Sequence, residues 1–263
     1  MIKITSKENA LIKHIIKLKE KKYRNEYNEY IVEGIKLVKE AIDEKVSIKN
    51  IIISEETFKN ELFEKNLKKR LENIEYIIVE NNIFKFISDV EKPQGVMAII
   101  NKNEWNNQID FSKDVILALD DIQDPGNLGT IIRTADSCNI SQILLSKGTV
   151  DCYNSKVIRS TMGAIFRVKI IECENLEKTL NEIKSHNFKI VVTDLNTRKN
   201  IYDVNYEKSI IVIGNEANGA SKEIINLADE RVIIPMIGKT ESLNASVATG
   251  VILYEYIRQK MNY

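Results

Sequence analysis

The chain has 263 residues, enough for one large domain or two small ones, and 43% of them are hydrophobic, enough for a sizeable core. Its 38 basic and 38 acidic residues balance, so bulk charge does not indicate nucleic acid as a partner. The longest apolar runs are five residues, which excludes a helix across a bilayer, and the N-terminus lacks the apolar stretch of a signal peptide. We therefore expect a cytoplasmic protein without a membrane partner.

The chain has too few cysteine and histidine residues to indicate a disulfide framework or a metal site. Cys138, Cys152 and Cys173 are odd in number and form no Cys-x-x-Cys pair, and the chain has two histidines, His14 and His186. The sequence predicts no metal site.

The first 24 residues differ locally from the rest in charge, with eight basic residues against two acidic ones. Thr5-Ser6-Lys7-Glu8 resembles a capping box, and apolar residues then recur at helical spacing, which predicts a helix to about Lys22. Its lysines face either water or phosphates, and this stretch alone does not decide between them.

Strand-like runs follow along the whole chain. Those at 30–32, 48–53, 76–79 and 95–100 alternate with helical patterns and predict a small α/β layer domain. The polar residues 101–112 break both periodicities and indicate a linker. Near-continuous apolar runs then predict a parallel sheet covered on both faces, with a last helix over about 243–261. These runs are 115–119, 143–145, 168–171, 190–193, 210–213 and 232–234. We thus expect domains at 1–100 and 113–263.

Three polar, glycine-containing segments lie at strand ends of the second domain, where open α/β sheets bind ligands. The first reads Asp124-Pro-Gly-Asn-Leu-Gly-Thr-Ile-Ile-Arg133-Thr-Ala. Asn127 is placed to cap a helix beginning near Leu128, which presents Arg133 on its polar side. Taken alone, the segment is equally compatible with a capped helix that bears a surface arginine.

The second segment reads Val212-Ile-Gly-Asn-Glu216-Ala-Asn-Gly-Ala-Ser-Lys222. Gly214 and Gly219 have the spacing of a P-loop, but the Gly-Lys-Ser/Thr that binds phosphate and magnesium is missing. Glu216 would also put a carboxylate into the anion site, so we reject a nucleotide triphosphatase. Glu216 either caps a helix at Ser221 or has a functional role.

The third segment reads Ile233-Ile-Pro-Met-Ile-Gly-Lys-Thr-Glu-Ser242-Leu-Asn244-Ala-Ser-Val-Ala-Thr-Gly250. Ser242 and Asn244 precede a helix start, where main-chain N–H groups are unpaired. The small residues after Asn244 allow close packing against another element or a second subunit.

In order and content the three segments resemble the motifs of SpoU-type (TrmH-like) RNA 2'-O-ribose methyltransferases of the SPOUT superfamily, over about 114–258. Tyr30-Ile-Val-Glu-Gly and Lys92-Pro-Gln-Gly-Val-Met-Ala resemble the ribosomal-protein-like RNA-binding domain of the same family. The resemblance implies an α/β fold, with a trefoil knot in the C-terminal parallel-sheet domain and a smaller N-terminal RNA-binding domain. It also implies a homodimer with the first-motif and last helices at the interface.

The resemblance further implies that S-adenosylmethionine (AdoMet) donates a methyl group to a ribose 2'-hydroxyl. The cofactor-binding residues it implies are Thr193, Gly214, Ile234, Leu243 and Asn244. The catalytic residues it implies are Arg133, Asn127, Glu216, Ser242 and Asn244. The two-domain arrangement favours large-subunit (23S) ribosomal RNA (rRNA), contacted through the basic first helix. Tyr23, Tyr27 and Tyr30 offer stacking surfaces for its bases, although tyrosines at this spacing are more often packing residues. A tRNA methyltransferase, a resistance-conferring rRNA methyltransferase and a non-catalytic ribosome-assembly factor stay open as alternatives.

Overall fold

The computed structural model describes residues 2–61, 63, 67–71, 74–102 and 108–261. Contacts divide the chain into two compact units. The first comprises Met1–Glu104 and Tyr153–Phe166, and the second comprises Trp105–Cys152 and Arg167–Tyr263. No helix among the described residues is both long and apolar enough to span a membrane.

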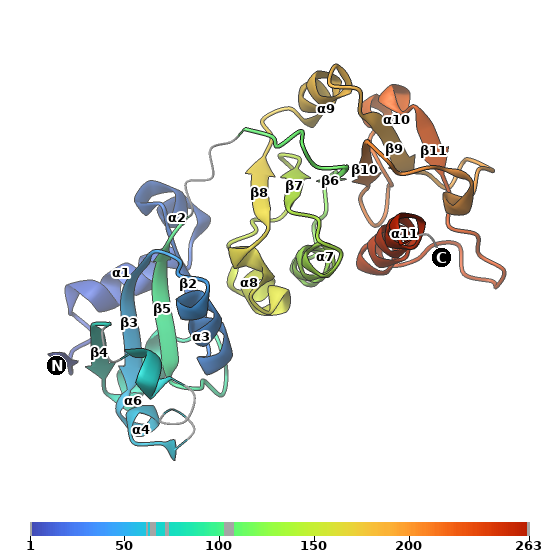
Figure 1. The fold of residues 1–263 in the computed structure, drawn as a ribbon. Coiled ribbons are helices and arrows are strands. Elements are labelled where there is room, and N and C mark those ends of the chain that lie inside the picture. Colours follow the sequence, from blue (N-terminus) through green and yellow to red (C-terminus); the bar gives the residue numbers. More distant parts are fainter. Residues whose placement is uncertain (1, 62, 64–66, 72–73, 103–107, 262–263) are drawn as a thin grey trace. The chain divides into compact units, whose positions relative to one another are not determined.

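A five-stranded mixed sheet forms the centre of the first unit, in the order β1-β4-β3-β5-β2 (Figure 1). β5 runs antiparallel to both of its neighbours, and the other pairs are parallel. The strands are β1 (Ile2–Ile4), β2 (Glu29–Glu33), β3 (Ile48–Ser54), β4 (Tyr76–Val79) and β5 (Val96–Asn101). Among the described residues before 102, the helices are α1 (Ala10–Leu18), α2 (Lys21–Tyr27), α3 (Ile35–Asp43), α4 (Glu55–Phe58), α6 (Asn81–Ile87) and a 3₁₀ turn at Lys68–Leu71. Buried side chains of α1 and α6 share one core with β3 and β5.

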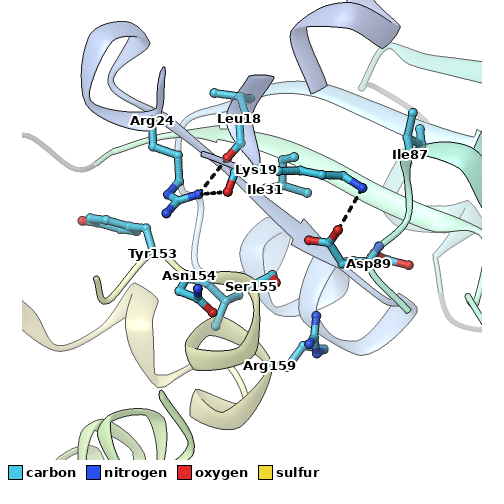
Figure 2. A pocket seen from close by; sticks show the side chains of 12 residues that line it. Leu18, Lys19, Arg24, Ile31, Ile87, Asp89, Tyr153, Asn154, Ser155 and Arg159 are labelled. Carbon is cyan, nitrogen blue, oxygen red and sulfur yellow. Dashed lines mark hydrogen bonds and ion pairs between the residues drawn. The ribbon is translucent and has the colours of Figure 1, made fainter. Parts of the chain in front are cut away.

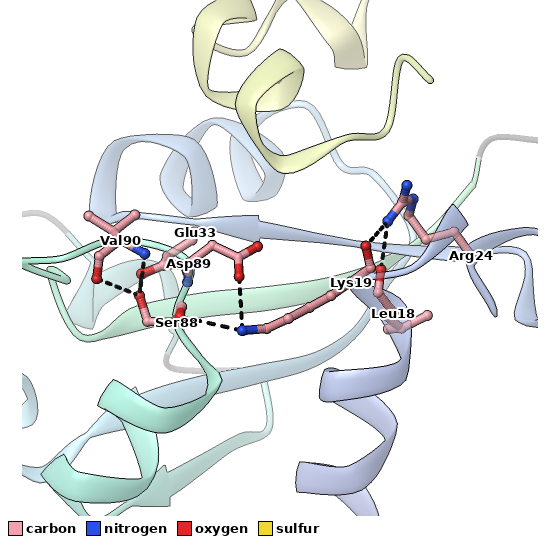
Figure 3. Close-up of polar contacts among 7 residues, drawn as sticks. All are labelled: Leu18, Lys19, Arg24, Glu33, Ser88, Asp89 and Val90. Carbon is pink, nitrogen blue, oxygen red and sulfur yellow. Dashed lines mark hydrogen bonds and ion pairs between the residues drawn. The ribbon is translucent and has the colours of Figure 1, made fainter. Parts of the chain in front are cut away.

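The predicted first helix is wrong in both of its bounds. It begins at Ala10, because the side chain of Asn9 caps it by accepting the N–H of Leu11, whereas Ser6 accepts from Glu8 outside the helix. It ends at Leu18, because the buried guanidinium of Arg24 donates to the main-chain oxygens of Leu18 and Lys19 (Figure 3). A second short helix, α2, follows.

Residues 153–166 also belong to the first unit, although their composition does not set them apart in the sequence. They form α8 (Ser155–Thr161) and a 3₁₀ turn at Ala164–Phe166. Tyr153 and Arg159 face a small crevice together with Arg24 and Asp89 (Figure 2). The ring of Tyr153 lies 4.6 Å from that of Tyr30 between centroids.

Tyr30 is 2% exposed, so it packs in the core. The expectation that its ring offers RNA a stacking surface is therefore wrong. Tyr23 and Tyr27 are partly exposed.

All six strands of the second unit are parallel, in the order β11-β9-β10-β6-β7-β8, which confirms the predicted parallel sheet. The strands are β6 (Val115–Leu119), β7 (Gln142–Leu145), β8 (Lys169–Glu172), β9 (Lys189–Thr193), β10 (Ser209–Ile213) and β11 (Glu230–Val232). The helices are α7 (Pro125–Ser137), α9 (Leu176–Lys184), α10 (Lys222–Leu227), α11 (Ala245–Lys260) and a 3₁₀ turn at Ile201–Asp203. α9 and α10 share a core with the sheet, and α7 packs against α11 away from them (Figure 1). The trefoil knot stays a prediction.

Candidate active site

A pocket of about 330 Å³ lies where β9, β10 and β11 end in loops. Because these strands are parallel, their carboxyl ends meet at one edge of the sheet. Four of the five residues predicted to bind the cofactor line this pocket: Thr193, Gly214, Ile234 and Leu243. The fifth, Asn244, directly follows Leu243 and caps α11.

Gly214 is required by the shape of the pocket wall. A Cβ atom at this position would lie 2.0 Å from the main-chain nitrogen of Ala220. The chain comes so close because loop 214–221 folds back on itself, with Asn215 and Gly219 exchanging two main-chain hydrogen bonds of 3.0 and 2.9 Å. Any side chain at 214 would displace this loop.

The lining of the pocket suits a flat apolar group with polar edges. Leu195, Ile225 and Met236 contribute apolar surface. The main-chain N–H groups of Ile234 and Leu243 have no hydrogen-bond partner among the described residues and are available to a ligand. This donor set fits the adenosyl group of AdoMet, whose base edge needs main-chain partners.

Three predicted catalytic residues are connected by hydrogen bonds. Asn127 donates from Nδ2 to Oε1 of Glu216 at 2.8 Å, and Asn244 donates from Nδ2 to Oδ1 of Asn127 at 2.9 Å. Oδ1 of Asn244 in turn accepts the N–H of Ser246, as expected of a helix cap. One polar chain thus joins the three sequence segments beside the pocket, which Glu216 lines.

The predicted capping role of Asn127 is wrong. α7 begins at Pro125 and is capped by Asp124, whose carboxylate accepts the N–H of Asn127. The Asn127 side chain therefore points away from its own helix and reaches Glu216. Glu216 does not cap α10 either, since the side chain of Glu216 bonds Asn127, and the N–H of Ser221 donates to Asp120 instead.

Arg133 and Ser242 are not part of this chain of bonds. Arg133 is exposed on α7, and its guanidinium has no hydrogen-bond or ion-pair partner among the described residues. It follows Asn127 by six positions, which places it about 240° further around the helix. Ser242 lines the pocket from an exposed position.

Sequence reasoning missed Asp120, Asp121 and Asn215, which fix loop 214–221. Asp120 accepts the N–H of Ser221 at 2.8 Å, and Asn215 donates to the main-chain oxygen of Asp121 at 2.8 Å. The available signal was two consecutive acidic residues directly after an apolar strand, at the sheet edge where parallel strands bind ligands.

Within the described part of the chain, one group of side chains is close enough to hold a metal ion. Ligand atoms of Asp151, Cys152 and Glu172 lie within 4.8 Å of one another. None of the three lines the pocket described above. The expectation that the protein uses no metal stays a prediction.

A parallel sheet with a loop-lined pocket at its carboxyl edge is the architecture of an α/β enzyme that binds a cofactor or substrate there. Residues 114–254 match the SpoU rRNA Methylase family, and residues 9–98 match the MRM3-like substrate binding domain. The chain belongs to the SpoU rRNA methylase family, which confirms the resemblance of the three segments, and its N-terminal part matches a substrate-binding domain of that kind. It is an AdoMet-dependent RNA 2'-O-methyltransferase.

Relatives and solved structures agree with this assignment. The chain is 30% identical to the 23S rRNA (guanosine(2553)-2'-O)-methyltransferase RlmP of Bacillus subtilis, over 97% of this chain and 98% of that protein. The AdoMet-bound rRNA methyltransferase of Sinorhizobium meliloti is 30% identical, with a TM-score of 0.84 over 98% of this chain and 97% of that one. The TrmH/SpoU tRNA modifying enzyme of A. aeolicus is 34% identical, but covers 57% of this chain and 77% of that one, with a TM-score of 0.52.

Proposed function

We propose that this enzyme methylates a ribose 2'-hydroxyl of large-subunit (23S) rRNA, with Asn127, Glu216 and Asn244 at the reacting centre. The observation that carries the proposal is the hydrogen-bonded chain that joins these three residues beside a loop-lined pocket. Three separate sequence segments supply its members. A purely structural role would not need all three polar side chains together.

AdoMet, in this proposal, is held by loop backbone around Thr193, Gly214, Ile234 and Leu243, with Asn244 beside them. Bound there, it supplies the electrophilic methyl group. The unpartnered N–H groups of Ile234 and Leu243 support this assignment. So does the close approach of Ala220 to Gly214, which shapes the wall.

The protein's part in the reaction is to orient the ribose and to help remove the hydroxyl proton. Holding the reacting atoms in line can supply much of the rate. Arg133 is a poor general base, because a guanidinium stays protonated in proteins. We assign it to orienting the ribose and an adjoining phosphate with its planar fork of donors, and a phosphate oxygen to assisting proton removal. Ser242 would contact the RNA at the rim of the pocket.

Two observations favour rRNA over tRNA. Two relatives that cover nearly the whole chain, including the substrate-binding domain, those of B. subtilis and S. meliloti, are described as rRNA methyltransferases. The tRNA-modifying enzyme of A. aeolicus covers little more than half of this chain. A substrate within ribosomal RNA also favours a cytoplasmic location.

The basic first unit offers a surface for RNA. Lys17, Lys21 and Lys22 have no carboxylate partner among the described residues, so their charges are available to phosphates. The rings of Tyr23 and Tyr27 are stacked 6.1 Å apart with an angle of 12° between their planes. We propose that this surface contacts the substrate.

A homodimer would bury the exposed side of α11. Val247 is 50% exposed and Tyr254 is 55% exposed, and they lie seven residues apart on one helix face with Val251 between them. Gly250 faces Thr134 of α7, and a Cβ atom at this position would lie 3.9 Å from the Thr134 methyl carbon. We propose that this apolar stripe on α11, together with α7, pairs with a second copy.

The test is incubation of purified protein with labelled AdoMet and, separately, total tRNA, naked 23S rRNA and intact large ribosomal subunits. We expect label in 23S rRNA or in the subunit, abolished by Arg133→Ala. Label in tRNA would overturn the substrate. Bound AdoMet without label in any RNA would instead support the non-catalytic assembly factor.

A further inference from the structure

Two consecutive aspartates after β6 hold the loop that carries Glu216. Asp120 accepts the N–H of Ser221 through Oδ2 at 2.8 Å. Asn215 donates from Nδ2 to the main-chain oxygen of Asp121 at 2.8 Å and to its carboxylate Oδ2 at 3.2 Å. Both ends of loop 214–221 are thus attached to the chain segment that leads into α7, the helix that bears Asn127.

The Asn215 side chain has a second set of bonds, within the loop itself. Its Oδ1 accepts the N–H of Ala217 at 2.9 Å and that of Asn218 at 3.1 Å. The acceptor half of one amide therefore shapes the turn, while the donor half attaches the turn to Asp121. Glu216 lies between these contacts, one residue after Asn215.

Asp121 is itself held in an uncommon conformation. Its φ of 60° is in the left-handed region, which residues other than glycine adopt infrequently. The N–H of Asp121 donates to Oγ of Ser146 at 2.8 Å. A Cβ atom at Gly148 would lie 2.1 Å from the Asp121 carboxylate, so a side chain there would displace this carboxylate. Three strand-end loops therefore converge on the anchor of Asn215.

We infer that Asn215 is a positioning residue: the donor half of its amide sets the Glu216 carboxylate against Asn127. Glu216 is exposed, so burial does not fix its position and the turn must do so. Reacting groups need to be held within about 0.5 Å of their productive geometry. The inference rests on the proposed function, because Asn215 acts through Glu216 and Asn127, which that function places at the reacting centre.

The decisive variant is Asn215→Asp, which keeps the turn acceptor and removes the donor. The new carboxylate would face both the carbonyl and the carboxylate oxygens of Asp121. We expect kcat at saturating AdoMet and RNA, measured near pH 8, to fall toward the ~100-fold loss that a 1 Å misplacement can cause. Protonating the new carboxyl restores a donor. The Asp121 carboxylate beside it would raise the pKa of the new carboxyl, so the kcat of the variant relative to wild type should rise as the pH is lowered to about 6.

Other charged groups near Asp121 are the same in both proteins, so the effect of their own titration on kcat cancels in this ratio. They line a hollow on the same side of loop 214–221: Asp120, Lys147, Glu174, Glu177, Lys222 and Glu223. Gln123→Glu is the matched control. Gln123 donates to Asp121 Oδ2 at 3.2 Å, so this variant adds the same charge beside Asp121 but keeps the amide of Asn215 and its donor. Its kcat should stay within about twofold of wild type.

Two results would overturn the inference. One is an Asn215→Asp protein with full kcat near pH 8. The other is a loss that is the same at every pH and accompanied by a matching loss of melting temperature and AdoMet binding, which would make Asn215 merely structural. Absence of turnover by the wild-type protein on every RNA would be a different failure, that of the proposed function, and this inference would fall with it.

Discussion

Arg133 is exposed and, unlike Asn127, Glu216 and Asn244, takes no part in the hydrogen-bonded chain beside the pocket. A guanidinium without a protein partner keeps all five of its donors for a ligand. A ribose hydroxyl with its neighbouring phosphate presents acceptors that a planar fork can bind in pairs.

Arg133→Lys keeps the positive charge but removes the planar guanidinium, so it tests the paired hydrogen bonds separately from the charge. We expect kcat to fall about tenfold or more, because a hydrogen bond to a charged group contributes about 1.5–3 kcal/mol and lysine cannot bind in pairs. AdoMet affinity, measured by titration calorimetry, should not change. Arg198→Lys, at another exposed arginine of the same unit, is the control and should keep full turnover. Nearly full turnover by Arg133→Lys would rule out the planar-fork role.

The sequence motifs named residues that the structure brings together, but they did not predict the hydrogen bonds between these residues. The motifs named Asn127, Glu216 and Asn244, but the periodicity of α7 pointed to Asn127 as a cap. Asp124 is the better cap, because Pro125 suits the first helical position, and this frees the Asn127 amide. The bonds from Asp121 to Asn215 join residues 94 positions apart, which no local pattern can predict.

Helix α11 has apolar residues on its exposed side as well as on its buried side. Ile252, Leu253 and Tyr256 are buried, whereas Val247 and Tyr254 of the same helix are exposed. Exposed apolar stripes of this kind are typical of interfaces. The small residues at its N-terminal end let it approach α7 closely.

We expect the wild-type protein to be a dimer and Val247→Glu to be largely monomeric, because the variant buries an unpaired carboxylate in the interface. Light scattering after size-exclusion chromatography measures both masses. Phe86→Glu is the matched control, since Phe86 is an exposed apolar residue of the first unit, 46% accessible, and lies outside α7 and α11. A monomeric wild-type protein, or a dimeric Val247→Glu protein, would contradict the proposed interface.

Strands were predicted more reliably than helix ends. The buried strands of the second unit stand out as apolar runs, and most of their bounds agree to within one residue. β11 differs: it ends at Val232, because Ile233 bonds Lys199 and Ile201 outside the regular ladder. The split between α1 and α2 depends on the buried Arg24, whose reach back to Leu18 is a tertiary contact.

For the whole molecule, periodicity indicated a parallel sheet but not its strand order. The order β11-β9-β10-β6-β7-β8 depends on which crossover each helix makes, and apolar runs do not encode that choice. The family resemblance implied a knotted parallel sheet, and it gave no strand order either. Neither indicated that 153–166 packs with the first unit, because that depends on contacts such as Tyr153 with Tyr30.

In the proposed function, the pocket and the hydrogen-bonded residues Asn127, Glu216 and Asn244 together direct a methyl group to a ribose oxygen. The most direct test is to digest the labelled RNA to nucleosides and to identify the methylated atom by mass spectrometry, for the wild-type protein and for Glu216→Gln. We expect label in one 2'-O-methylribonucleoside and its loss in the variant. Label on a base, or full ribose methylation by Glu216→Gln, would contradict it.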